Sequence, residues 1–234
     1  MSILAITSDL EQLADERDAV NLQRFFKTGP GEYGEGDRFR GIRVPALRRL
    51  VRAHAATPLA DILSLLRSPY HEDRLLALLM LVRQYERADP SAQQLIYDMY
   101  LDNTRYINNW DLVDLSAGAI IGGHLSERSR APLKRLAQSK SLWERRIAVL
   151  ATFHFIKHGE FDETMSIAAM LLDDREDLIH KAVGWMLREV GNRDGGAERA
   201  FLARHCRVMP RTMLRYAIEK FPEEERVSYL RGTA

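Results

Sequence analysis

The sequence predicts an all-α protein of HEAT-like helix pairs, an α-α superhelix with a concave face. Almost every segment carries apolar residues at helical spacing, and the strict two-residue alternation typical of strands is absent. In the segment that starts at His71, one face is formed at i, i+3, i+4 and i+7 by Leu75, Leu78, Leu79 and Val82. Because no strand pattern competes with this periodicity, helices are expected along nearly the whole chain.

A regular spacing of long apolar helices is the strongest sign of internal repeats. They are expected to begin near His71, Asn108, Leu142, Leu178 and Arg211, in steps of 37, 34, 36 and 33 residues. A shorter and more polar helix precedes each of them, which is typical of an α-solenoid. The step lies between tetratricopeptide and HEAT lengths, and the Trp/Gly/Tyr pattern of tetratricopeptides is missing. An irregular helical domain without superhelical curvature is the alternative.

Helix boundaries follow from caps, prolines and glycines. Starts are expected at Pro45, Thr57-Pro58 and Asp89-Pro90, and ends at Gly159 and Gly191. A glycine-rich segment over 29–41 is expected to be a long loop, and it follows no strand, which disfavours a dinucleotide site. We interpret 1–234 as one domain, with N-terminal helices and this loop over about 1–44 and repeats over about 45–234.

The composition suits a folded protein with a sizeable core. The chain is 46% hydrophobic and 29% charged, and its single cysteine, Cys206, favours a reducing compartment. No apolar run is long enough to span a membrane, and no signal peptide is evident, so a cytoplasmic protein is expected. The net charge is only +1, yet seven basic residues stand against two acidic ones over 127–146. A local basic patch of this kind can bind phosphate, although a solvated helix face explains it equally well.

One helix carries a pair of residues suited to chemistry. Trp110, Asp114 and Gly118 recur at i, i+4 and i+8, which places an aromatic ring one turn before a carboxylate. No Lys or Arg lies within four residues of Asp114, so any partner must come from another helix. On spacing alone, a structural carboxylate bonded to a neighbouring arginine remains the better explanation.

Two later helices offer candidates at the same repeat phase. Arg146 lies near the start of one and Trp185 in the next, so in-register stacking would bring both to the face of Trp110 and Asp114. Tryptophan faces can hold a sugar or a cationic base, an arginine can grip a phosphate, and a carboxylate can stabilise oxocarbenium charge. The seven histidines are dispersed and HExxH is absent, so no metal or cofactor is expected.

Long stretches of the chain resemble the AlkD-type DNA alkylation repair proteins, from about Phe25 to Leu230. The resemblance is carried by INNWDLVDLSA, LWERRIAVLATFHFIKHGEFDETMSIA, DLIHKAVGWMLREVG and MPRTMLRYAIEKFP. It implies a HEAT-like superhelix that cradles double-stranded DNA. It also implies a glycosylase that hydrolyses the N-glycosidic bond of cationic N3- and N7-alkylpurines, without a cofactor and in base excision repair.

The resemblance assigns roles to individual residues. Asp114 matches the catalytic aspartate, and Trp110 and Trp185 match the tryptophans that contact the lesion-bearing deoxyribose. Val44 and Pro45 occupy the loop that approaches the opposite strand, where the best-known members carry smaller polar residues than Arg43 and Val44. Arg146 matches the arginine that holds the backbone near the lesion. From their positive charge, further contacts to the DNA backbone are expected from Arg145, Lys181, Arg43, Arg211 and Arg215.

Because Arg43 and Val44 differ from the residues of the best-known members, three functions remain as hypotheses. A monomeric glycosylase acting on duplex DNA is the leading hypothesis. The first alternative is a non-catalytic paralogue that binds branched or distorted DNA, which the altered loop favours. The second is a protein–protein scaffold, the commonest use of HEAT-like arrays, which predicts an acidic or apolar concave face.

Overall fold

The computed structural model describes residues 3–233, and over this range it is entirely helical. It contains fourteen α-helices, two short 3₁₀ turns and one π-helix, and its one β-type feature is an isolated bridge between Arg38 and Tyr70. The predicted all-α helical-repeat fold is confirmed. The internal contacts divide into two compact units, one that ends at Ser116 and one that begins at Ala117. The expectation of one continuous domain stays a prediction.

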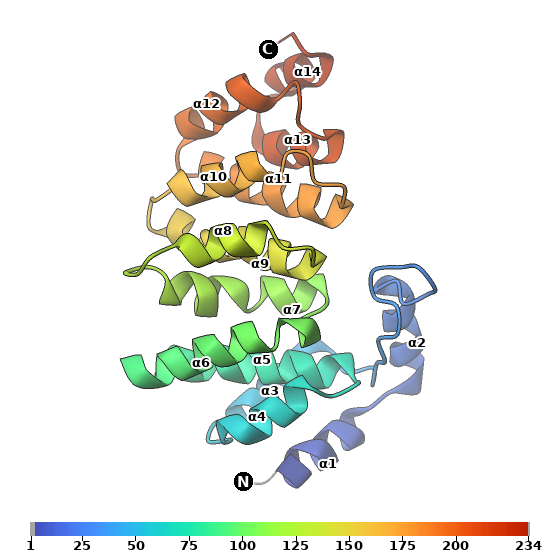
Figure 1. Cartoon of the computed structure of the whole chain (residues 1–234). Coiled ribbons are helices and arrows are strands. Elements are labelled where there is room, and N and C mark those ends of the chain that lie inside the picture. The colour runs from blue at the N-terminus through green and yellow to red at the C-terminus, as the bar shows by residue number, and fades with distance from the viewer. Residues whose placement is uncertain (1–2, 234) are drawn as a thin grey trace. The chain divides into compact units, whose positions relative to one another are not determined.

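The first unit is organised around one long helix, α5 (His71–Tyr85). Residues 71–81 of α5 are all buried, because α3, α4, α6 and α7 pack against it from different sides (Figure 1). The sequence predicts one apolar face for α5, whereas the structure buries nearly its whole circumference. The other helices of this unit are α1 (Ile3–Leu13), α2 (Glu16–Phe25), α3 (Val44–Ala53), α4 (Leu59–Leu66), α6 (Pro90–Asp102) and α7 (Trp110–Asp114), with a 3₁₀ turn at Thr104–Tyr106.

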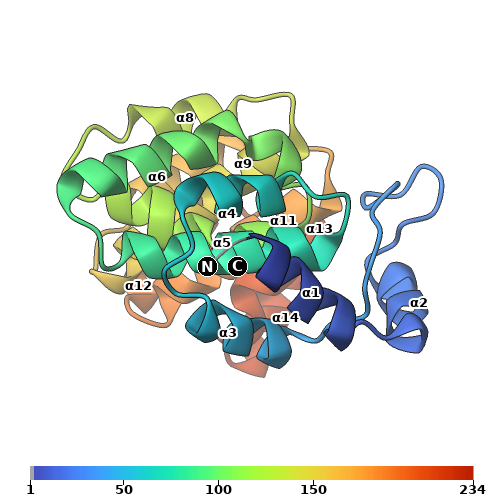
Figure 2. The same cartoon turned by 90° about the horizontal axis from the view of Figure 1, so that it is seen from below.

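The second unit repeats one arrangement of helix pairs. The π-helix η2 packs on α9, α9 on α11, and α11 on α13, while α8, α10 and α12 each contact the longer helix that follows or precedes them (Figures 1 and 2). This stacking of successive second helices is what the sequence period predicts for the unit. Its elements are η2 (Gly118–Gly122), α8 (Ala131–Ala137), α9 (Leu142–Lys157), α10 (Asp162–Met170), α11 (Asp177–Gly191), α12 (Gly195–His205), α13 (Arg211–Ala217), a 3₁₀ turn (Ile218–Lys220) and α14 (Glu223–Arg231).

The helix starts agree with the sequence to within two residues. The five helices predicted as long begin at His71, Trp110, Leu142, Asp177 and Arg211, but the helix from Trp110 has only five residues and the helix from Arg211 only seven. Local capping explains the agreement, because the Asp89 carboxylate accepts the Ala92 N–H at 2.9 Å to begin α6, as its Asp-Pro pair predicts. Among the described residues, no helix is long and apolar enough to cross a membrane.

The prediction that Trp110, Asp114 and Gly118 lie on one continuous helix is wrong. Helix α7 ends at Asp114, a turn follows, and Gly118–Gly122 forms a π-helix. A Cβ on Gly122 would lie 2.3 Å from the Ala151 carbonyl oxygen, so this segment can approach α9 only with glycine there. Gly118 therefore does not continue the stripe of Trp110 and Asp114 on one regular helix.

Glu198 is a buried acid in the second unit. Its side chain is 1% exposed and lies against Gly191, where a Cβ would collide with the Glu198 carboxyl group. Its Oε1 atom has no hydrogen-bond partner. Burial raises the pKa of Glu198 to about 8, so the folded protein keeps this carboxyl protonated at neutral pH.

Glu198→Gln should make stability less dependent on pH. Between pH 4.5 and about 8 the unfolded chain ionises Glu198 while the folded chain keeps its proton. The free energy of unfolding therefore falls as the pH rises, by at most about 1.4 kcal/mol per pH unit. Urea unfolding of the wild type and of E198Q from pH 5 to 8 should show curves that diverge, with E198Q gaining relative stability as the pH rises. The exposed Glu224→Gln is the control, and parallel curves for E198Q and wild type would contradict the assignment.

Candidate active site

Trp110 and Asp114 lie on the same short helix, α7. They are one turn apart, so both side chains leave the same face, and both are half-buried. The Asn109 side chain caps the helix and accepts the Trp110 N–H at 2.8 Å. Both residues therefore sit on a backbone segment whose start is fixed by a local hydrogen bond.

The Trp110 ring is held by aromatic residues from the N-terminal part of the chain. Phe26 stacks on it with ring centroids 5.3 Å apart and planes inclined by 26°, and Phe25 meets it edge-on at 6.0 Å. The indole Nε1–H donates to the Tyr33 hydroxyl at 3.3 Å. Because Tyr33 belongs to the glycine-rich loop, that loop and the end of α2 both set the position of the indole.

The glycine-rich loop is attached to the first turn of α5 through Glu72. The Glu72 carboxylate, in a side chain only 2% exposed, accepts the backbone N–H groups of Arg40 at 2.9 Å, Gly41 at 2.8 Å and Ile42 at 3.1 Å. Gly41 has φ +84°, and a Cβ there would lie 2.0 Å from the Asp15 carbonyl oxygen. One buried carboxylate thus fixes three consecutive amides, and the close approach to Asp15 requires glycine.

A second set of contacts supports the same attachment. Arg40 forms a two-pronged ion pair with Asp73, at 2.7 and 3.0 Å, and its guanidinium lies 4.0 Å from the centroid of the Tyr70 ring. The backbone N–H of His71 donates to the Arg38 carbonyl oxygen at 2.8 Å. The loop is therefore bound along its length rather than projecting freely.

A buried charge cluster links this loop to α7. His71 donates from Nδ1 to Asp37 at 3.2 Å and from Nε2 to Asp111 at 2.8 Å, and Arg74 donates to Asp37 at 2.6 Å. Burial lowers the pKa of His71, but the hydrogen bonds to Asp111 and Asp37 outweigh it and leave that pKa raised. Burial likewise opposes ionisation of Asp37, yet His71 and Arg74 hold its pKa below the usual value. Both ring nitrogens of His71 therefore face carboxyl oxygens, an arrangement that favours the protonated imidazole.

Asp114 has a buried polar neighbourhood on its own unit. Ser116 donates to the Leu112 carbonyl oxygen at 2.6 Å, which leaves the Tyr100 hydroxyl to donate to Ser116 at 2.9 Å. Burial raises the pKa of Tyr100, and the negative charge of Asp114 raises it further. Tyr100 therefore stays protonated and donates its hydroxyl hydrogen to Ser116.

The remaining predicted site residues lie in the second unit, on α9, α11 and α13. Trp185 is half-buried, donates to Glu189 at 3.3 Å and lies 6.2 Å from the Phe153 ring. Arg146 is only 5% exposed, and its guanidinium donates to the Leu178 carbonyl oxygen. Whether these residues share a site with Trp110 and Asp114 stays a prediction.

The other predicted backbone contacts differ in how far their charges are already paired. Arg145 is ion-paired with Asp174 at 2.6 Å, Lys181 with Asp177 at 2.7 Å, and Arg43 with Asp18 at 2.8 Å. Arg211 and Arg215 are exposed on α13. Val44 and Pro45 form the first turn of α3, with Arg43 as its N-cap, so the loop itself ends before them.

Sequence reasoning missed the residues that hold Trp110, above all Phe26, Tyr33 and Glu72. They lie 84, 77 and 38 positions before it, so no helical spacing connects them to it. A usable signal is the pair Glu72-Asp73 in the first turn of a helix whose next residues, 75–82, are all apolar. Within residues 3–233, no group of three or more His, Cys, Asp or Glu side chains could hold a metal ion.

Comparisons with known proteins identify the family. A family model described as DNA alkylation repair enzyme matches residues 6–221, nearly the whole chain, so the protein belongs to the DNA alkylation repair enzyme family. A solved structure described as a predicted DNA alkylation repair enzyme from Enterococcus faecalis is similar, with a TM-score of 0.70. The two sequences are 15% identical, and the match covers 90% of this chain and 97% of the Enterococcus faecalis chain. At this level of identity, the similarity shows a shared fold alone. A comparison with curated proteins found no match.

Glu72→Gln should detach the loop that holds Trp110. The amide of glutamine offers one acceptor oxygen instead of two charged ones, so at least one buried N–H loses its partner, at a cost of about 2–3 kcal/mol. Hydrogen exchange at residues 40–42 should accelerate, and the Trp110 fluorescence should change. Glu86→Gln, just beyond the other end of α5, is the charge-matched control. Unchanged protection of those three amides would show that Glu72 does not hold the loop.

Proposed function

We propose that this protein is a monofunctional DNA glycosylase that excises cationic N3- and N7-alkylpurines, such as 7-methylguanine, from duplex DNA in base excision repair. Family membership supports a role in the repair of alkylated DNA. The observation that carries the finer proposal is the placement of Trp110 and Asp114 on one face of α7, with the indole clamped by Phe26 and Tyr33. We expect a monomer that acts in the cytoplasm on nucleoid DNA.

The chemistry needs few groups because the substrate is already activated. An N3- or N7-alkylated purine carries a positive charge and leaves as a neutral base, so no general acid is required. Positive charge then develops on the deoxyribose, where the carboxylate of Asp114 would stabilise it and position the attacking water. The face of Trp110 would bind the sugar through its electron-rich ring.

The second unit would supply the remaining contacts through HEAT-like pairs that line a concave face. Trp185 is proposed as the second ring against the deoxyribose. Arg146 is proposed to hold the backbone near the lesion, and its bond to the Leu178 carbonyl would fix the direction of the guanidinium. Further backbone contacts are proposed for Arg145, Lys181, Arg43, Arg211 and Arg215, and an opposite-strand contact for Val44 and Pro45.

Asp114→Asn should reduce the release of 7-methylguanine from duplex DNA by about 10²-fold or more, because the neutral amide cannot stabilise the oxocarbenium charge. The released base is measured by chromatography under single-turnover conditions. Asp102→Asn, an exposed substitution at the end of α6, is the matched control and should keep wild-type release. If D114N releases the base as fast as D102N, Asp114 is not the catalytic carboxylate.

A non-catalytic protein that binds branched or distorted DNA is the second candidate. Two contacts of Trp110 favour it. Phe26 already covers one face of the indole ring, and the Tyr33 hydroxyl already accepts the indole N–H. A ring engaged in this way has less surface for a deoxyribose. The protein would then keep the fold and the basic residues of its family without turnover.

Incubation with N7-methylated duplex DNA separates the two functions. A glycosylase is expected to leave abasic sites, which alkali converts to strand breaks that a gel resolves. The second candidate is expected to bind four-way junctions more tightly than duplex DNA, with an affinity that falls strongly as salt rises. It is expected to leave no abasic sites. Tyr33→Phe removes the hydroxyl that accepts the indole N–H. If the glycine-rich loop sets the position of Trp110 for catalysis, this substitution should change the rate of base excision. Equal excision by Y33F and wild type would show that it does not.

A further inference from the structure

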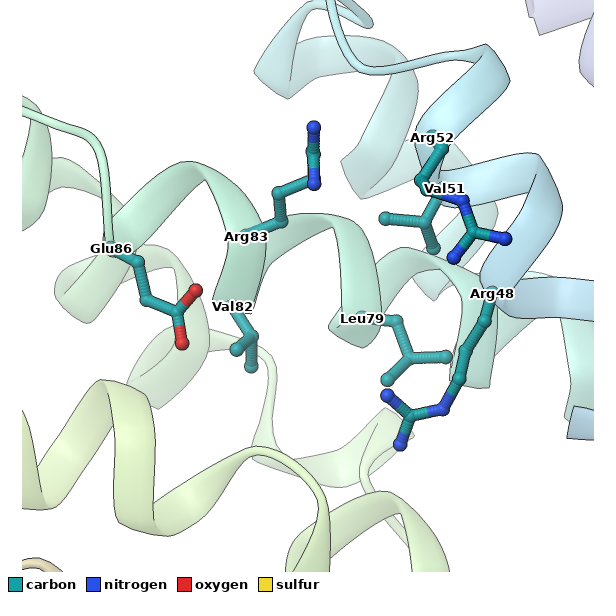
Figure 3. Close-up of a pocket in the computed structure, with 7 residues that line it drawn as sticks. All are labelled: Arg48, Val51, Arg52, Leu79, Val82, Arg83 and Glu86. Atoms are coloured by element: carbon teal, nitrogen blue, oxygen red, sulfur yellow. The ribbon is translucent and has the colours of Figure 1, made fainter. Parts of the chain in front are cut away.

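A basic pocket lies between α3 and α5, apart from the side chains assigned above. Its volume is about 240 Å³. Seven residues line it, three from α3 and four from α5 and its C-cap: Arg48, Val51, Arg52, Leu79, Val82, Arg83 and Glu86 (Figure 3).

The lining residues follow from helical spacing on two packed helices. Arg48 and Arg52 are one turn apart on α3, and the residues from α5 recur at i, i+3, i+4 and i+7 from Leu79. Val51, Leu79 and Val82 supply the apolar part of the lining. In Figure 3 the Arg48 side chain extends from α3 toward Leu79, while Glu86 lies beside Val82.

The positive charges of this pocket outnumber its single negative charge. In the part of the chain that the structure describes, none of Arg48, Arg52 and Arg83 makes a side-chain hydrogen bond or ion pair, and the Nε of Arg83 is buried without an acceptor. Elsewhere in the same unit two largely buried arginines are ion-paired, Arg40 with Asp73 and Arg74 with Asp37. Buried donors normally find acceptors, so the vacant one at Arg83 points to a ligand that brings oxygen atoms.

Charge and shape together define the class of ligand. Three guanidinium groups against the single carboxylate of Glu86 leave a net charge of +2 around a cavity large enough for a tetrahedral anion. Like charges at i and i+4 on α3 repel each other, and a bound anion relieves that repulsion. Guanidinium forks match the oxygen geometry of phosphate and bind it through two parallel hydrogen bonds.

We propose that the α3–α5 pocket binds a phosphate group, and that this group is a phosphodiester of the DNA backbone. The choice of DNA rests on the proposed function, while the anion site rests on the arginines alone. The pocket is a second anchor for the duplex, one that uses neither Trp110 nor Asp114. It contributes to affinity equally for damaged and undamaged DNA, since a phosphate contact does not read the base.

The test compares single substitutions on the same helix. Arg52→Gln removes an exposed charge that lines the pocket, and Arg49→Gln removes another exposed charge of α3 that does not line it. Binding of an undamaged 20-base-pair duplex is measured by fluorescence anisotropy between 50 and 200 mM KCl. R52Q and R83Q should weaken binding about tenfold and lower the log–log salt slope by about 1, whereas R49Q should change both little. Glu86→Gln should strengthen binding.

A titration with inorganic phosphate at constant ionic strength distinguishes the sources of the anion. NMR signals of the arginine Nε–H groups should shift saturably in the wild type, and duplex DNA should displace the phosphate. Saturable phosphate binding with equal DNA affinities for R52Q and R49Q would assign the pocket to a free phosphate compound and overturn the DNA assignment. No saturable shift together with equal affinities would overturn the site itself.

The failure of this inference is separable from failure of the proposed function. The binding assay uses undamaged DNA and requires no excision. A protein without glycosylase activity can therefore still show the expected loss of affinity in R52Q. An active glycosylase whose R52Q variant binds DNA like R49Q would refute the pocket alone. Circular dichroism melting curves confirm that each variant is folded before its affinity is interpreted.

Discussion

The Glu72 carboxylate is the contact on which the surroundings of Trp110 depend. It ties three consecutive amides of the glycine-rich loop to the first turn of α5. The same loop carries Tyr33, whose hydroxyl accepts the indole N–H, and α5 itself packs against α7. A buried charge is costly unless several donors surround it, and here the donors belong to the segment that must be ordered. The same bonds therefore offset the cost of burial and position the loop.

Charge compensation separates the structural cations of the first unit from those available to a ligand. His71 and Arg74 are buried, and each is bonded to Asp37, so they hold elements together. Arg48, Arg52 and Arg83 line a pocket without partners of their own. An unpaired charge is favourable only where solvent or an anion contacts it. Whether an arginine is ion-paired therefore indicates, better than composition does, whether it joins two elements or can bind a ligand.

Helical periodicity and capping were sufficient to predict the repeat. Both act between residues at most four positions apart, and the five helices that mark the repeat accordingly begin within two residues of their predicted starts. The π-helix at Gly118–Gly122 could not be predicted in the same way. Its geometry depends on the close approach of Gly122 to the Ala151 carbonyl, a contact with a helix about thirty residues later.

For the candidate site, the sequence by itself determined that Trp110 and Asp114 share one face of a helix, since a separation of four residues decides this locally. Only the tertiary structure decided what surrounds them. Phe26 and Tyr33 reach the indole from more than seventy residues earlier, and α3 and α5 must pack before a basic pocket exists between them. Such contacts depend on the folded path of the chain, which spacing along the sequence does not encode.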